Sequence, residues 1–206
     1  MHVMSERPKI QHHATYEDYL AVPEGKVVEL IDGVLYTQSR PASPHTITAS
    51  ALGGRLNVTF GDASESIDGP GGWWILSEPE LQIGANVLVP DVGGWRRARG
   101  VMPPITHRET ILPDWVCEVL SPGQHGRDRL LKCDKYARAG IAHYWIVDPV
   151  ELTIEVLRLE QGRYIPVQSA EGNVAGRFEP FEAHELALGR LWDRGIVSPK
   201  DEPAQR

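Results

Sequence analysis

Residues 114–149 read DWVCEVLSPGQHGRDRLLKCDKYARAGIAHYWIVDP and carry the clearest structural signals in the chain. The apolar run Asp114–Leu120 is short and rich in β-forming residues, so it predicts a strand. A helix is expected from about Asp128 to Ala139, ended by Gly140 in the left-handed cap position. Ile141–Val147 predicts a further strand, which the Asp-Pro pair after it stops.

The N-terminal part of the chain carries signals for a short helix, a hairpin and a longer helix. Thr15 is placed to cap a helix over Tyr16–Leu20. Lys26–Tyr36 predicts two strands around a turn at Asp32-Gly33, which is a strong hairpin signal. Ser43-Pro44 is typical of a helix start, and apolar residues at helical spacing extend this helix to about position 58.

The remaining segments favour short strands and one more helix. Strands are expected over Trp73–Leu76, Glu80–Ile83, Val87–Val92, Thr153–Leu159 and Arg163–Val167, the last two forming a hairpin, and a helix over Glu182–Trp192. Residues 1–14 and 194–206 are polar and predict tails around a single domain over 15–193. This mixture of strands and helices predicts the α+β or mixed α/β class.

Composition fits a soluble globular enzyme better than a protein that coats nucleic acid. The 206 residues are 41% hydrophobic and 24% charged, with a net charge of −7. No stretch reaches the roughly 18 apolar residues of a membrane helix, and the N-terminus lacks an apolar signal region. The two cysteines, Cys117 and Cys133, form no motif and predict reduced thiols. We therefore expect a cytoplasmic protein without membrane contact.

The charge is unevenly distributed along the chain. Residues 91–145 hold nine Lys and Arg against six Asp and Glu, a local balance of +3 that leaves −10 for the rest. The acidic total therefore excludes an indiscriminate basic coat, but it allows positive charge to gather around one site.

Two carboxylates are embedded in apolar, strand-like sequence and are the first candidates for chemistry. Asp91 follows Val87–Pro90, and Glu118 lies within Trp115–Leu120. Burying an ionised carboxylate costs several kcal/mol unless a cation or a donor compensates it. One interpretation is a strand-edge acid paired with an arginine. The other is a pair of metal ligands, because carboxylate oxygens and water are what Mg²⁺ and Mn²⁺ prefer.

Lys132 is the candidate cation for this site. It shares one helix face with Asp128 and Tyr136 through the i, i+4, i+8 spacing. From that face it could reach the strand of Glu118, orient a nucleophilic water and stabilise charge on a phosphate. The alternative is an ordinary surface ion pair between Lys132 and Asp128.

An ordered set of segments resembles the Uma-type restriction endonuclease family of the PD-(D/E)XK nuclease superfamily. The resemblance covers roughly residues 15–167 and implies a restriction-endonuclease-like fold, a mixed central sheet flanked by helices, and metal-dependent phosphodiester cleavage. In the superfamily a lysine lies two residues after the acid, where this chain has Leu120. The Uma-type pattern moves the lysine to the following helix, where Lys132 matches it. The matching segments are Thr15–Tyr19, Glu29–Gly33, Ser43–His45, Pro90-Asp91, Glu118–Pro122, Asp128 with Lys132 and Tyr136, and Ala139–Pro149.

The same resemblance offers Glu29 and His45 as further site residues. Glu29 would supply a third carboxylate or steer water, and its alternative is an outward-facing strand residue. His45 would contact a phosphate or assist proton transfer, and its alternative is an ordinary residue at a helix start.

A glycine-rich segment after Asp91 is the candidate substrate contact. Arg96, Arg97 and Arg99 would grip the nucleic-acid backbone while Trp95 stacks on a base. The alternative is a solvated turn with Trp95 partly buried.

The leading hypothesis is a nuclease in which Asp91 and Glu118 hold Mg²⁺ or Mn²⁺ and Lys132 positions a metal-activated water. Nucleic acid is the expected partner, DNA before RNA, and a homodimer would serve to cut two strands. The first alternative is a catalytically silent module that keeps the fold to bind nucleic acid or protein. A second is a glycosidase with two catalytic acids, which would need no divalent ion.

Overall fold

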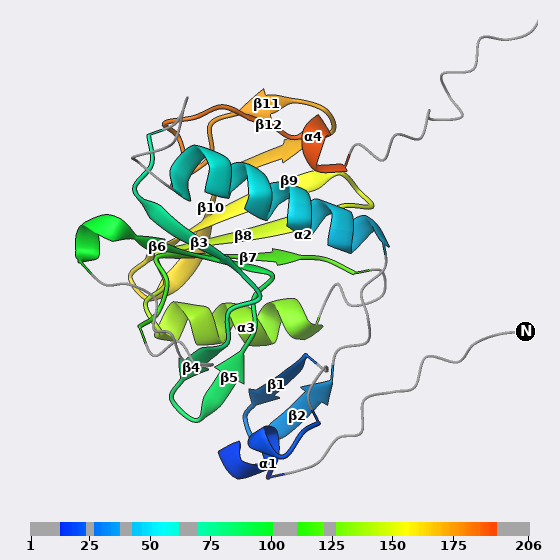
Figure 1. The fold of residues 1–206 in the computed structure, drawn as a ribbon, viewed down its shortest axis with the longest axis vertical. Coiled ribbons are helices and arrows are strands. Elements are labelled where there is room, and N and C mark those ends of the chain that lie inside the picture. Colours follow the sequence, from blue (N-terminus) through cyan, green and yellow to red (C-terminus); the bar gives the residue numbers. More distant parts are fainter. Residues whose placement is uncertain are drawn as a thin grey trace, which may run out of the picture.

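The computed structural model describes residues 13–23, 27–37, 43–61, 70–100, 111–121 and 127–192, with side chains described from residue 131 onward in the last segment. Its centre is a six-stranded sheet in the order β10-β9-β8-β7-β6-β3 (Figure 1). Only β7 and β8 run parallel, because a helix, α3, connects them. The strand bounds are β3 Trp73–Ser77, β6 Val92–Arg96, β7 Trp115–Val119, β8 His143–Asp148, β9 Thr153–Glu160 and β10 Arg163–Glu171.

The segment 114–149 forms the predicted strand, helix and strand. The helix α3 spans Arg127–Arg138, and Gly140 after it has φ +78°, as expected for a left-handed cap. Side chains of β7 alternate between two cores: Cys117 packs with α2 (Ser43–Leu56), whereas Val116 packs with α3. Figure 1 shows these two helices on opposite faces of the sheet. The central sheet is thus covered on both sides, as the predicted fold class requires.

A second, four-stranded sheet has the order β2-β1-β5-β4 and lies beside α3 (Figure 1). The predicted hairpin is confirmed, and both turn residues have positive φ, +50° at Asp32 and +73° at Gly33. The predicted first helix is also confirmed as α1, Tyr16–Leu20, with Thr15 and Asp18 forming a capping box. The strands are β1 Val28–Ile31, β2 Val34–Thr37, β4 Leu81–Ile83 and β5 Asn86–Leu88.

The single strand predicted over Val87–Val92 is wrong. The chain leaves the small sheet after β5 and enters the large sheet at β6, and Pro90 lies between them. Proline has no N–H for a ladder hydrogen bond, so it breaks the pairing at this point. The glycine-rich loop predicted after Asp91 is also wrong, because Gly93 and Gly94 belong to β6, which lies between β3 and β7.

Glycine at position 94 is required by packing. A Cβ there would lie 3.0 Å from Trp115 Cε3 and 3.3 Å from Ile75 Cδ1. Trp115 in turn packs edge-on against Trp145 and Phe181. The bare backbone of β6 therefore makes room for the aromatic core under α2.

The long helix predicted over Glu182–Trp192 is wrong in its first half. Leu186–Ala187 forms strand β12, paired with β11 (Ala175–Gly176), and only Gly189–Trp192 is helical, as α4. Leu186 and Leu188 are buried while Ala187 is exposed, which is a strand alternation. The predicted helix that begins at Ser43 is confirmed as α2, and a π-helical turn over Asn57–Gly61 follows it.

Most of the predicted tails, residues 1–12 and 194–206, lie outside the described residues, as does position 193 of the predicted domain. Ala14, placed in the tail by prediction, is buried and donates its N–H to Gly33 O at 2.7 Å. Within the described ranges, no helix is long and apolar enough to cross a membrane.

Candidate active site

Glu118 lies in β7 and faces α3, on the same side of the sheet as Val116. Its carboxylate accepts hydrogen bonds from Lys132 Nζ at 3.0 and 3.1 Å and from the Tyr136 hydroxyl at 2.8 Å. Both donors come from α3, one turn apart. The predicted shared helix face therefore points at Glu118.

Lys132 is the centre of the candidate site, and it is only 4% exposed. Its ammonium lies 2.8 Å from Glu29 Oε1, in addition to its bonds with Glu118, and 3.5 Å from Val89 O. Lys132 is therefore not a surface residue, and the alternative partner Asp128 has a side chain that lies outside the described part. A buried ammonium between two carboxyl groups has the nearby partners that a buried cation needs.

The charges in this group shift one another's pKa. Burial disfavours the charged form of Lys132, but the carboxylates of Glu118 and Glu29 outweigh burial, so its pKa lies well above the ordinary value. Burial also raises the pKa of Glu118; Lys132 and Tyr136 oppose this rise, and the negative charges of Asp91 and Glu29 add to it. Lys132 is thus held in its charged form.

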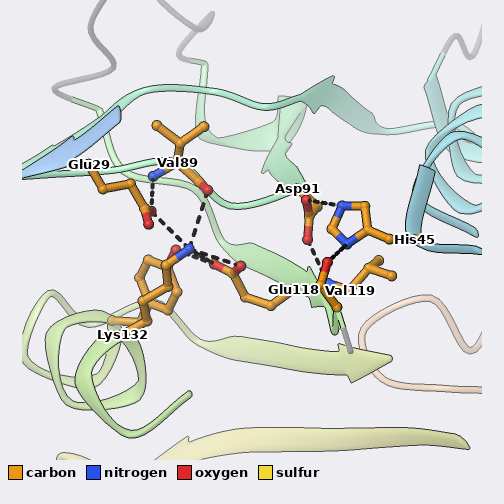
Figure 2. A network of polar contacts seen from close by, with 9 residues as sticks. Glu29, His45, Val89, Asp91, Glu118, Val119 and Lys132 are labelled. Carbon is orange, nitrogen blue, oxygen red and sulfur yellow. Dashed lines mark hydrogen bonds and ion pairs between the residues drawn. The ribbon is translucent and has the colours of Figure 1, made fainter. Parts of the chain in front are cut away.

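Glu29 reaches the site from the small sheet. Its Oε1 accepts the N–H of Val89 at 2.8 Å as well as the ammonium of Lys132 (Figure 2). Glu29 is 4% exposed, which excludes the alternative of an outward-facing strand residue. The irregular Val89–Asp91 segment between the sheets therefore contributes backbone groups to the site.

Asp91 and His45 form the other half of the network in Figure 2. Asp91 Oδ2 accepts the N–H of Val119 at 2.6 Å, and Oδ1 lies 2.9 Å from His45 Nε2. The β6–β7 register pairs Val92 with Cys117, so one further residue sets Asp91 opposite Glu118. Burial opposes a charge on His45, but the hydrogen bond to Asp91 and its negative charge raise the His45 pKa above the ordinary value.

Five residues predicted from the sequence meet at this site, and two polar neighbours were not predicted to take part. The five are Glu29, His45, Asp91, Glu118 and Lys132. The neighbours are Tyr136, noted for its helix position and its place in a family-like segment, and Ser121, whose Oγ lies 3.2 Å from His45 Nδ1. The spacing Lys132–Tyr136 could have indicated the first. Ser121 belongs to the family-like segment Glu118–Pro122, but the sequence assigned it no role.

The three arginines predicted to bind substrate lie at the far end of β6 and have partners within the protein. Arg96 stacks 4.5 Å over the Trp73 ring, and Arg97 stacks 3.4 Å over Trp74 and donates to backbone carbonyls. Arg99 donates to Asp114 and to Leu112 O. Arg97 therefore holds its own segment in place, whereas Arg96 and Arg99 are exposed.

Trp95, predicted as a stacking or partly buried residue, is fully buried. Its exposure is 0%, and Nε1 donates to Ile111 O at 2.6 Å. A side chain enclosed in this way has no ring face for a base, so the predicted stacking is wrong.

The donor set fits a hard divalent cation. Asp91 and Glu118 supply carboxylate oxygens, and after the hydrogen bonds above each carboxylate keeps at least one lone pair. Among the described residues, no group of three or more His, Cys, Asp or Glu side chains is arranged to hold a metal ion. Two carboxylates suffice for Mg²⁺, which retains several waters and also binds substrate phosphates.

A family model matches most of the chain. The family described as "Uma2: Putative restriction endonuclease" matches residues 15–189. The chain belongs to this family. A search of curated proteins gives no match.

A solved structure shows that the fold of this Uma2 family member recurs. It is described as "a putative nuclease belonging to DUF820" from Anabaena variabilis ATCC 29413. The two chains are 23% identical with a TM-score of 0.67, over 86% of this chain and 97% of the other. The restriction-endonuclease-like fold expected from the sequence is thereby confirmed.

Proposed function

We propose that this protein is a nuclease that uses a divalent cation to hydrolyse phosphodiester bonds of nucleic acid, with DNA as the expected substrate. The observation that carries the proposal is the buried ammonium of Lys132, held between Glu29 and Glu118 beside Asp91. Stability alone does not require these buried charges, because apolar residues of similar volume often stabilise a protein as well as a buried ion pair does. Membership of the Uma2 family supports the same activity.

Each side chain has a defined task in this proposal. Asp91 and Glu118 would hold Mg²⁺ or Mn²⁺, which when bound neutralises phosphate charge and acidifies water. Lys132 orients the attacking water and stabilises the negative charge that develops on the phosphate. Glu29 fixes the ammonium of Lys132 from the other side and ties it to the Val89 backbone.

Substrate contact outside the reacting phosphate is proposed for Arg96 and Arg99. Arg96 lies five residues beyond Asp91, roughly 17 Å along an extended strand. These exposed guanidinium groups would therefore contact phosphates several nucleotides away from the cleaved bond. Cutting both strands of a duplex would call for two copies of the site, so we propose a homodimer on DNA.

Cleavage of supercoiled plasmid in Mg²⁺ or Mn²⁺ tests the proposed activity. The wild type is expected to nick or linearise the plasmid, EDTA to stop the reaction, and Asp91→Asn and Glu118→Gln to abolish it. Asp134→Asn is the matched control, because Asp134 lies exposed on α3 and pairs with Arg138. Failure to cleave DNA or RNA, or full activity of Asp91→Asn, would contradict the proposal. Binding without turnover would favour the catalytically silent alternative.

A further inference from the structure

Ser121, His45 and Asp91 form a linked chain of side chains that the proposed reaction does not yet use in full. Ser121 Oγ lies 3.2 Å from His45 Nδ1, and His45 Nε2 lies 2.9 Å from Asp91 Oδ1. The three residues come from separate elements: Ser121 follows β7, His45 is in the first turn of α2, and Asp91 precedes β6. Tertiary structure alone brings them together.

His45 has no ring nitrogen left for a phosphate. Nδ1 faces Ser121 and Nε2 faces Asp91, and the residue is 8% exposed. Rotation of the His45 ring would break the contact with Ser121 and the contact with Asp91. The contacts of His45 therefore direct its effect to Asp91 rather than to the substrate.

Asp91 is anchored at both oxygens. Val119 N–H binds Oδ2 at 2.6 Å from the backbone of β7, and His45 binds Oδ1 from α2. A carboxylate held at both oxygens cannot rotate about its Cβ–Cγ bond without losing a hydrogen bond. The lone pairs that remain for a cation consequently point in a fixed direction.

We propose that Ser121 and His45 are positioning residues that set the orientation of the Asp91 carboxylate for a divalent cation, Ser121 acting through His45. We call the linked residues Ser121, His45 and Asp91 the relay. The inference rests on the proposed function, since it assigns this relay to the same metal site. Residues that orient metal ligands typically change metal affinity about 10–100-fold when they are replaced. Ser121 acts one link further away, so we expect Ser121→Ala to weaken Mn²⁺ binding by about 10-fold, the low end of that range.

Two substitutions at His45 distinguish the contact that Nδ1 makes with Ser121 from the contact that Nε2 makes with Asp91. Glutamine carries an amide nitrogen near the position of Nε2, so His45→Gln keeps a donor for Asp91 but loses the partner of Ser121. Asparagine reaches only the position of Nδ1, so His45→Asn loses the contact with Asp91. We expect His45→Gln to bind Mn²⁺ within a few-fold of Ser121→Ala, and His45→Asn to bind it more weakly than both.

Calorimetric titration of the full-length protein with Mn²⁺ tests the relay through a double-mutant cycle. If Ser121 acts through His45, Ser121→Ala has no further effect on Mn²⁺ affinity once His45→Gln is present. Ser169→Ala is the control, because Ser169 is exposed on β10, three strands away from β7. Thermal unfolding of each variant verifies that it folds, and the cycle does not depend on His45→Asn.

Nitrogen-15 spectra of the metal-free protein give a readout that needs no cation. Ser121→Ala should shift the His45 Nδ1 resonance, whereas Ser169→Ala should leave it in place. The relay would be overturned by wild-type Mn²⁺ affinity in Ser121→Ala, by an unchanged Nδ1 resonance, or by additive losses in the double variant. A wild type that binds no Mn²⁺ would instead refute the proposed function and the metal role of the relay with it.

Discussion

Replacing Lys132 with methionine removes the ammonium that bridges two buried carboxylates. Methionine keeps the unbranched stem, so packing between α3 and the sheets changes little. The ammonium of the wild type lies 2.8 Å from Glu29 and 3.0 Å from Glu118. Without it, Glu118 retains the Tyr136 hydroxyl as its donor among the described residues, and Glu29 retains the Val89 N–H.

The expected loss of stability follows from the cost of an uncompensated buried carboxylate. Breaking a buried ion pair by removing one partner costs about 3–5 kcal/mol. A stranded carboxylate can escape by taking up a proton, and the pKa of Glu118 is already raised to about 8 in the wild type, so this escape distinguishes the two proteins above about pH 8. We therefore expect Lys132→Met to lower the free energy of unfolding by about 3–5 kcal/mol at pH 7 and by more than that at pH 9.

The pH dependence has a definite sign. Lys132 provides the largest contribution that lowers the pKa of Glu118, so the variant raises this pKa further above its unfolded value. A carboxyl group whose folded pKa is raised withdraws stability as pH rises, because the unfolded chain releases the proton first. The deficit of the variant must grow between pH 7 and pH 9, where Glu118 of the wild type loses its proton and Glu118 of the variant keeps it.

Urea unfolding followed by tryptophan fluorescence measures this loss at both pH values. Lys135→Met is the matched control on the same helix: Lys135 pairs with Asp32, whose side chain is 60% exposed, so its loss should be below about 1 kcal/mol. Equal losses for the two variants, or a Lys132→Met deficit that does not change with pH, would refute the electrostatic reasoning.

Three further outcomes follow from the structure. Tyr136→Phe removes one hydrogen bond to a carboxylate and should lower the free energy of unfolding by about 1.5–3 kcal/mol in urea titration; no loss would show that Glu118 finds another donor. Burial lowers the pKa of His143, although a nearby glutamate opposes this, so the unfolded chain takes up the proton first and stability falls as pH drops below about 6.5. His143→Gln should flatten the stability profile from pH 7 to 5 in thermal scans, and an unchanged slope would contradict this. Gly54→Ala, with open space around its Cβ in α2, should stabilise by about 0.5–1 kcal/mol, whereas Gly94→Ala should destabilise by about 1–3 kcal/mol; calorimetric melting should order the two variants in this way.

Local signals were sufficient for the elements that carry the site. The apolar runs around Glu118 and the helical spacing of Lys132 predict a strand and a helix from neighbours in the sequence alone. The Asp-Gly turn likewise predicts the hairpin that carries Glu29, because both turn residues must adopt positive φ. The residues themselves indicated that Lys132 could reach Glu118, whereas Glu29 and His45 were offered only by the family resemblance, since spacing gives no distance between segments far apart in the sequence.

Features that depend on long-range pairing were not predictable in this way. Gly93 and Gly94 are typical of a loop, yet they pair between β3 and β7, where a Cβ at Gly93 would lie 2.9 Å from Pro79 and one at Gly94 would lie 3.0 Å from Trp115. The predicted stacking role of Trp95 failed for the same reason, since a strand buries what a loop would expose. Ser121 joins the site through its contact with His45, which lies 76 positions away in the sequence and is indicated by no spacing pattern.

A crystal structure of the protein soaked in Mn²⁺, with anomalous diffraction data, is the most direct test of the central claim. An anomalous peak in contact with the carboxylates of both Asp91 and Glu118, with the ammonium of Lys132 beside it, is the predicted result. A peak confined to other residues, or none at saturating Mn²⁺, would contradict the assignment of this site as a divalent-cation nuclease centre.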